Sequence, residues 1–167
     1  MGSTLIVDEI QGATAATKVK MPVGHVMQTV TGSTSTVNTG SATFSSIGSA
    51  SITPVSTSSK ILLIAQMHVY VRNLSTDAWR AGLIRFKRGS TAIFGDIGAD
   101  PYGSGAFFVG DSDRYMEYST RVYLDSPSTT SSVTYTIEGA SKGGLTSIEF
   151  NSGAYGSSSF YLQEIAG

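Results

Sequence analysis

The sequence predicts an all-β fold, an antiparallel β-sandwich of jelly-roll type with an extended N-terminal segment. Two observations support this prediction. Val, Ile, Thr, Tyr and Phe gather in runs where apolar and polar residues alternate, and almost no segment has a helical period. Turn-forming residues separate these runs at roughly the spacing typical of sandwiches and jelly rolls. With 167 residues and no cysteine, the chain can bury a core without disulfides.

The N-terminal part reads as an extended segment ahead of the sandwich. Its strand-like pieces are predicted at residues 5–10, 18–21 and 25–30. Residues 13–17 between them carry no bulky side chain, which suits a joint or a close approach of three chains. We therefore divide the chain into a docking or intertwining segment, residues 1–30, and a sandwich domain, residues 31–167. Residues 32–40 are rich in Ser and Thr and are predicted to form a loop or an exposed edge.

The remaining strands follow from alternation and from the turns between them. They are predicted at residues 43–53, 60–72, 79–87, 91–94, 115–125, 132–138, 145–150 and 159–165. The turns are predicted at residues 88–90, 126–128 and 139–144, and residues 95–110 form a long Gly-rich and Asp-rich loop.

The segment 60–72 is the strongest strand, and both of its faces begin apolar. One face consists of Ile61, Leu63, Ala65, Met67, Val69 and Val71, which we assign to the core. The other face consists of Leu62, Ile64, Gln66, His68 and Tyr70. Since a two-layer sandwich leaves that second face outside, we expect a neighbouring subunit to cover it. His68 then either lines a trimer axis, where its symmetry copies could meet around an ion, or is a packed, hydrogen-bonded histidine at an interface or surface. We favour the packed, hydrogen-bonded histidine.

The charge pattern argues against several classes of partner. The net charge is -1, only 14% of residues are charged, and long runs of one sign are missing. Nucleic acid and anionic membranes are therefore not expected as partners. No apolar stretch has the length of a membrane span, and the N-terminus lacks the apolar region of a signal peptide.

The chain lacks the spacing of catalytic motifs, so we do not expect an enzyme or a cofactor. Its two histidines are His25 and His68, and no Gly-x-Ser-x-Gly elbow occurs. A carbohydrate-active enzyme using two carboxylates, such as Asp96 and Asp113, is a less favoured alternative. Asp111 and Asp113, with Asp96 or Asp100, are weak candidates for calcium ligands. The simpler interpretation is that these short side chains cap turns.

Several aromatic residues fall in or beside predicted loops. They are Trp79, Tyr102, Phe107, Phe108 and Tyr155. Such side chains could stack on the sugars of a host surface glycan or contact another protein. Alternatively they pin long loops onto the sandwich.

An ordered set of short motifs resembles a family of small virion proteins of cyanophages and other marine tailed phages. The motifs are Ser3-Thr4-Leu5-Ile6-Val7-Asp8 with Ile10, Gly24-His25-Val26-Met27-Gln28, Ile52-Thr53-Pro54, Ser58-Ser59-Lys60-Ile61-Leu62, Arg88-Gly89-Ser90-Thr91, Leu124-Asp125-Ser126-Pro127 and Leu162-Gln163-Glu164-Ile165-Ala166-Gly167. Together they span nearly the whole chain.

The resemblance implies a jelly-roll homotrimer similar to the C1q and tumour-necrosis-factor architecture. It implies a tail-fibre-type structural protein that is assembled in the host cytoplasm and resides in the virion. Its partners would be other virion proteins and a host surface glycan. A trimeric capsid decoration protein, of the cement or head-fibre kind, is the alternative. On this view Leu62, Ile64, His68 and Tyr70 form the trimer interface.

Overall fold

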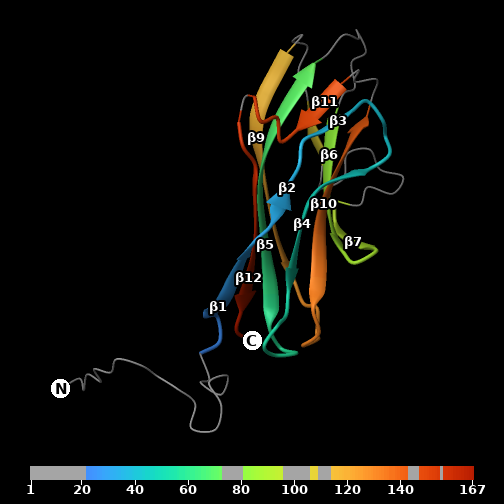
Figure 1. Cartoon of the computed structure of the whole chain (residues 1–167). Helices are drawn as coiled ribbons and strands as arrows, with labels where there is room; N and C mark the ends of the chain where they lie inside the picture. The colour runs from blue at the N-terminus through green and yellow to red at the C-terminus, as the bar shows by residue number, and fades with distance from the viewer. Residues whose placement is uncertain (1–21, 73–80, 96–105, 109–113, 143–146, 155) are drawn as a thin grey trace, which may run out of the picture.

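The computed structural model describes residues 22–72, 81–95, 106–108, 114–142, 147–154 and 156–167, and these form an all-β structure. Two antiparallel sheets pack face to face as a sandwich (Figure 1). The predicted antiparallel sandwich is therefore confirmed. Within these residues no helix is long and apolar enough to cross a membrane.

Sheet A has β5 at its centre. Its strands are β1 (Val26–Thr31), β12 (Ser159–Ile165), β5 (Lys60–Arg72), β11 (Ser147–Phe150) and β3 (Val37–Thr39), in that order, with β9 (Arg114–Asp125) on the opposite side of β5. β12 pairs with the first half of β5 and β11 with its last residues, whereas β9 pairs with β5 over twelve residues.

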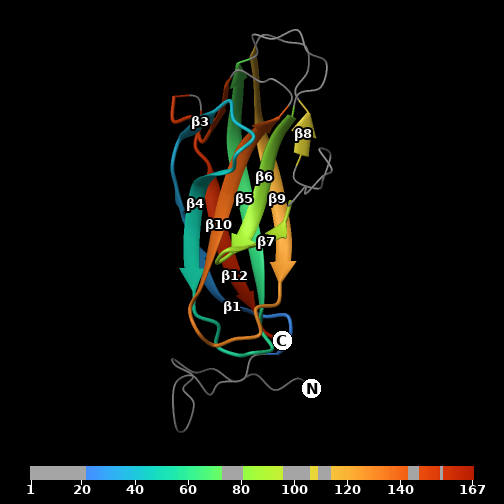
Figure 2. The same cartoon turned by 90° about the vertical axis from the view of Figure 1, so that its right-hand side faces the viewer.

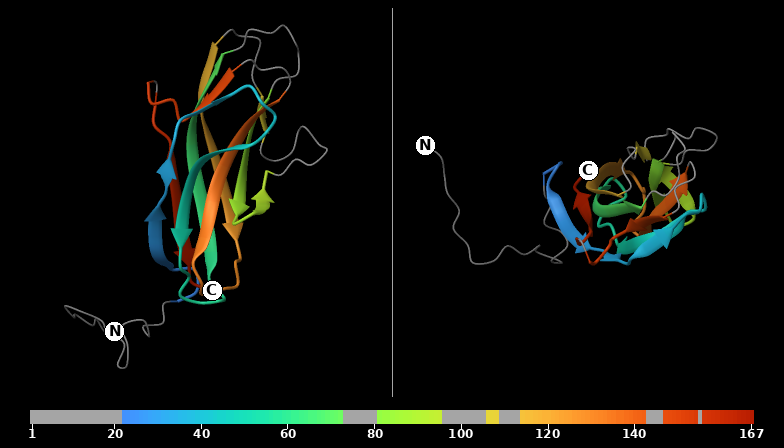
Figure 3. Two further views of the ribbon diagram at one scale, coloured as in Figure 1. Left: turned by 45° about the vertical axis from the view of Figure 1, so that its right-hand side comes forward. Right: turned by 90° about the horizontal axis from the view of Figure 1, so that it is seen from above.

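Sheet B covers one face of sheet A (Figure 2). Its strands are β2 (Ser33–Thr34), β4 (Ser45–Ile52), β10 (Val133–Lys142), β6 (Ala81–Arg88) and β7 (Thr91–Phe94), with β8 (Ala106–Phe108) also paired to β6. The views in Figure 3 show that the two layers enclose a single interior.

Two differences from the sequence prediction change which residues belong to the sheets. Residues 26–31 pair with β12, so they belong to sheet A although the predicted sandwich began at residue 31. The predicted turn at 139–144 is wrong in its first part, because β10 continues to Lys142. A Cβ on Gly139 would meet the side chains of Phe150 and Ile47. This glycine therefore serves close packing inside a strand and does not mark a turn.

The core is built from both sheets, and the predicted core face of 60–72 is confirmed. The side chains of Ile61, Leu63, Ala65, Met67, Val69 and Val71 are fully buried. They pack against sheet B, where the ring of Phe86 stacks on that of Phe160 from β12 with 6.1 Å between centroids. Alternation along β5 thus places every second residue in the interior.

A buried carboxylate joins β12 to β1 and to the loop before β5. Glu164 is fully buried, and its two oxygens accept hydrogen bonds from Gln28 Nε2 at 2.6 Å and from the Val55 backbone N–H at 2.7 Å. Burying a carboxylate is costly unless its oxygens are satisfied. These two donors therefore hold three separate segments together near Ile165.

Glu164→Gln is expected to destabilise the fold by about 1–3 kcal/mol, because one acceptor becomes an NH2 group that faces a donor. Urea denaturation at a fixed protein concentration measures the effect. Glu149→Gln is the matched control, since Glu149 is only partly buried and its change should stay within about 0.5 kcal/mol. Equal midpoints for the two variants would contradict the structural role of Glu164.

Candidate functional site

The outer face of sheet A carries the exposed apolar side chains of the strands. Six large apolar residues of the described strands are well exposed, and all lie in β1, β9 or β12: Val26, Met116, Tyr118, Val122, Leu124 and Tyr161. Leu62 and Ile64 of β5, which lie between β9 and β12, are partly exposed. We use the name assembly face for Leu62, Ile64, Val122, Leu124 and Tyr161.

The strand register brings these five side chains into two adjacent rows. Ile64 lies opposite both Val122 of β9 and Tyr161 of β12. One step along the sheet, Leu62 lies opposite both Leu124 and Gln163. Directly opposed residues on one face have their Cβ atoms about 5 Å apart. The assembly face is therefore a continuous apolar surface across three strands.

Charged side chains on this side of sheet A lie toward its margins. Lys60 is at one end of β5, Arg114 is at the far end of β9, and Glu149 is in the short strand β11. The facing residues of β5, β9 and β12 between them are uncharged. An apolar centre with a charged rim is the usual composition of a protein–protein interface.

Among the described strands β9 pairs with β5 alone, and it also directs charged side chains inward. Glu117 and Arg121 point toward the interior, where Glu117 accepts a hydrogen bond from the Tyr115 hydroxyl at 2.6 Å. That bond raises the pKa of Tyr115, and burial lowers the pKa of Arg121. Inward-pointing charges on an edge strand disfavour pairing with a further strand. A partner is thus expected to contact the face of β9 rather than its backbone edge.

The outer face of sheet B is polar by comparison. Glu138 of β10 pairs there with Arg85 at 2.7 Å and with Lys87 at 3.4 Å. Near the start of β10, the hydroxyls of Ser51 and Thr134 are 2.7 Å apart on the same face. The same face also holds a small apolar cluster of Ala81, Leu83 and Ala140, which is buried against Phe44. The two outer faces therefore differ, because among the described residues the well exposed large apolar side chains of the strands belong to sheet A.

A comparison with known proteins adds no family to this geometry. The chain matches no protein-family model, and none of the curated proteins matches it. The function must therefore be argued from the fold and its surfaces.

Two of the predicted interface residues are covered by the chain itself. Both His68 and Tyr70 are 3% exposed. The rings of His68 and Tyr118 meet edge to face, with 5.1 Å between their centroids. Gly156 lies so close to them that a Cβ at this position would collide with both side chains. Nδ1 of His68 has no hydrogen-bond partner among the described residues. His68 is thus packed within the single chain, but its Nδ1 lacks the hydrogen bond that the favoured interpretation included.

The segment over His68 is fixed by several hydrogen bonds. The Asn151 N–H donates to the His68 carbonyl at 2.8 Å, and Ser158 Oγ accepts from the His68 N–H at 2.9 Å. The Ser158 N–H in turn donates to Asn151 Oδ1 at 2.8 Å. Asn151 has a positive φ of 55°, which asparagine tolerates better than most residues. On β5 the partly exposed apolar side chains are therefore Leu62 and Ile64, while beside His68 and Tyr70 the exposed apolar side chains are Tyr118 and Met116 of β9.

The other predicted site residues fall mostly outside the described part of the chain. Phe107 and Phe108 lie in β8, whose backbone alone is described. Outside the described residues lie Trp79, Asp96, Asp100, Tyr102, Asp111, Asp113 and Tyr155. The described residues hold no group of three or more His, Asp or Glu side chains that could bind a metal ion. The calcium prediction on Asp111 and Asp113 is untested.

Sequence reasoning missed the contribution of β9 to the assembly face. Val122 and Leu124 are about half exposed, at 53% and 47%. Their alternation with Arg121 and Tyr123 was visible in the sequence. It did not reveal which of the two faces is the outer one.

Proposed function

We propose that this chain is a non-enzymatic structural protein of a phage virion, a homotrimeric tail-fibre-type module that attaches to the particle and presents loops for adhesion to the host surface. The observation that carries the subunit contact is the uncharged, apolar assembly face on sheet A. The phage assignment is supported by the resemblance of the ordered motifs described above.

A second copy of the chain is the occupant that best suits this face. Identical copies that meet around an axis bring equal side chains near one another, so a charged centre would repel itself. The rows of Ile64 and Leu62 hold no charge, and the charges of Lys60 and Arg114 lie toward the ends. The surface thus suits self-association better than recognition of a charged partner.

The strand order supports a jelly-roll interpretation of the sandwich. Eight strands pair in a nested way: β1 with β12, β4 with β10, β5 with β9, and β6 with β7. The first strand of this set thus pairs with the last, and the middle two pair with each other. A hairpin wound around a sandwich as a jelly roll has this pairing.

The positions of the chain ends suit a module that is attached at one end. The Gly24 N–H donates to the Ala166 carbonyl at 2.8 Å, so residues just before β1 lie beside the C-terminal residues (Figure 1). At the opposite end of β5, Arg72 lies opposite Arg114 in the ladder between β5 and β9. We place attachment at the end of the termini and adhesion at the other end, where β5 ends and β9 begins.

Three measurements test this proposal. Native mass spectrometry should give about three times the 17.5 kDa of one chain, and a monomer at micromolar concentration would overturn the trimer. Cryo-electron microscopy of the particle should locate the protein on the tail. Density at three-fold positions of the capsid would instead favour a decoration protein. Hydrolysis of a host polysaccharide, lost in Asp96→Asn or Asp113→Asn, would favour an enzyme.

A further inference from the structure

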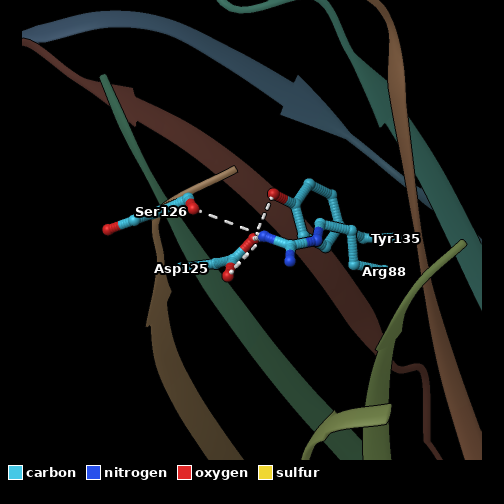
Figure 4. Close-up of polar contacts among 4 residues, drawn as sticks. All are labelled: Arg88, Asp125, Ser126 and Tyr135. Carbon is cyan, nitrogen blue, oxygen red and sulfur yellow. Dashed lines mark hydrogen bonds and ion pairs between the residues drawn. The ribbon is translucent and has the colours of Figure 1, made fainter. Parts of the chain in front are cut away.

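The last residue of β9 is held by a polar cluster that joins the two sheets (Figure 4). The carboxylate of Asp125 is buried and accepts from Arg88 Nη1 at 3.1 and 2.9 Å. It also accepts from the Tyr135 hydroxyl at 2.7 Å. Arg88 Nη1 reaches the Ser126 carbonyl at 3.4 Å as well. Burial, with this hydrogen bond, strongly raises the pKa of Tyr135, which therefore stays a donor.

The partners of Asp125 come from the opposite layer. Arg88 ends β6 and Tyr135 is in the core part of β10, both in sheet B, while Asp125 ends β9 in sheet A. Two further ion pairs, those of Glu138 with Arg85 and Lys87, lie within sheet B. The cluster at Asp125 thus fixes the end of an edge strand against the other sheet.

This position matters because β9 has a paired neighbour on one side, β5, within the described residues. An edge strand held by one ladder opens more readily than a central strand. Leu124 directly precedes Asp125, and Val122 lies two residues before Leu124. Both side chains belong to the assembly face. The position of Asp125 therefore sets the positions of the Val122 and Leu124 side chains on the outer face.

A buried ion pair is a poor way to gain stability, since apolar residues of similar volume often stabilise a core as well or better. Its best-attested use is to fix one arrangement among several. We propose that Asp125 and Arg88 are positioning residues for self-association, which hold the end of β9 so that Val122 and Leu124 meet a neighbouring copy of the chain. This inference rests on the proposed homotrimer.

The test compares Asp125→Asn with Glu138→Gln. Both variants neutralise a largely buried carboxylate of an ion pair, but Glu138 lies on the outer face of sheet B. Analytical ultracentrifugation gives the concentration at which half of the trimers dissociate. We expect Asp125→Asn to raise it about tenfold more than Glu138→Gln. Hydrogen exchange should also become faster in residues 120–125 of Asp125→Asn alone.

Arg88→Lys provides a second variant if Asp125→Asn does not fold. Lysine keeps the charge on a partly exposed side chain but loses the planar guanidinium geometry. It should weaken the trimer in the same direction. A trimeric wild type whose Asp125→Asn, Arg88→Lys and Glu138→Gln variants dissociate alike would overturn this inference while leaving the trimer in place. A monomeric wild type would overturn the proposed trimer and this inference together.

Discussion

Val122→Asp is expected to convert the proposed trimer into folded monomers. The Val122 side chain is 53% exposed in the single chain and lies opposite Ile64, so the substitution should leave the fold intact. In a covered interface the new carboxylate would lose its water without gaining a partner, which costs several kcal/mol. Symmetry repeats that cost in every copy. Native mass spectrometry at micromolar concentration should show the monomer mass, with an unchanged circular dichroism spectrum.

The matched control for this substitution is Thr134→Asp. Thr134 is exposed on the outer face of sheet B, near the start of its central strand β10. The control introduces the same charge on the opposite surface and should remain trimeric. Two trimeric variants would show that the assembly face is not the contact. A trimeric Val122→Asp beside a monomeric Thr134→Asp would place the contact on sheet B.

Phe160→Ala is expected to lower the free energy of unfolding by about 3–5 kcal/mol, the usual cost of emptying an aromatic site in a core. The ring of Phe160 is fully buried and stacks on Phe86 with an interplanar angle of 14°. A loss of this size is a large part of the stability of a small domain. Urea denaturation measures it best in the Val122→Asp background, where folding is separated from assembly.

Tyr161→Ala is the control, because Tyr161 is the next residue on β12 and points outward with 37% exposure. In the monomeric background it should cost much less than Phe160→Ala. In the wild-type background it should weaken the trimer. Equal unfolding free energies for the two variants would contradict the assignment of the two faces of β12.

The fold could be predicted from the sequence because alternation is a local property. The two faces of residues 60–72 separate into a buried set and an outer set as their spacing indicates. The strand at 115–125 was also predictable, but not its orientation. Its inward face contains Tyr115 and Tyr123, which pack against the core, while the more apolar Val122 points out. At the edge of a sandwich the interior opens to solvent, so tyrosine with its polar end can fill it.

Other parts of the site depend on contacts between distant segments. The burial of His68 is due to Gly156 and Ser158, about ninety residues further along the chain. The Glu164 carboxylate depends on Gln28, 136 residues away. Neither contact could be predicted from a local sequence pattern, because the residues around Gly156 and around Gln28 form no distinctive motif. Such pairings follow from the sheet topology, which composition and periodicity leave open.

The neighbouring positions of the residues before β1 and of the C-terminus have a mechanical consequence. If the particle holds the protein at this end and a host surface pulls at the other, the force runs along the strands. Antiparallel hydrogen bonds lie perpendicular to the strands, so this direction loads the bonds of a ladder together. A force between the two termini would instead open the ladder of β1 and β12 one bond at a time from Val26 and Ile165. The sandwich should therefore resist a force along its strands far better than a force that pulls β1 and β12 apart at the termini.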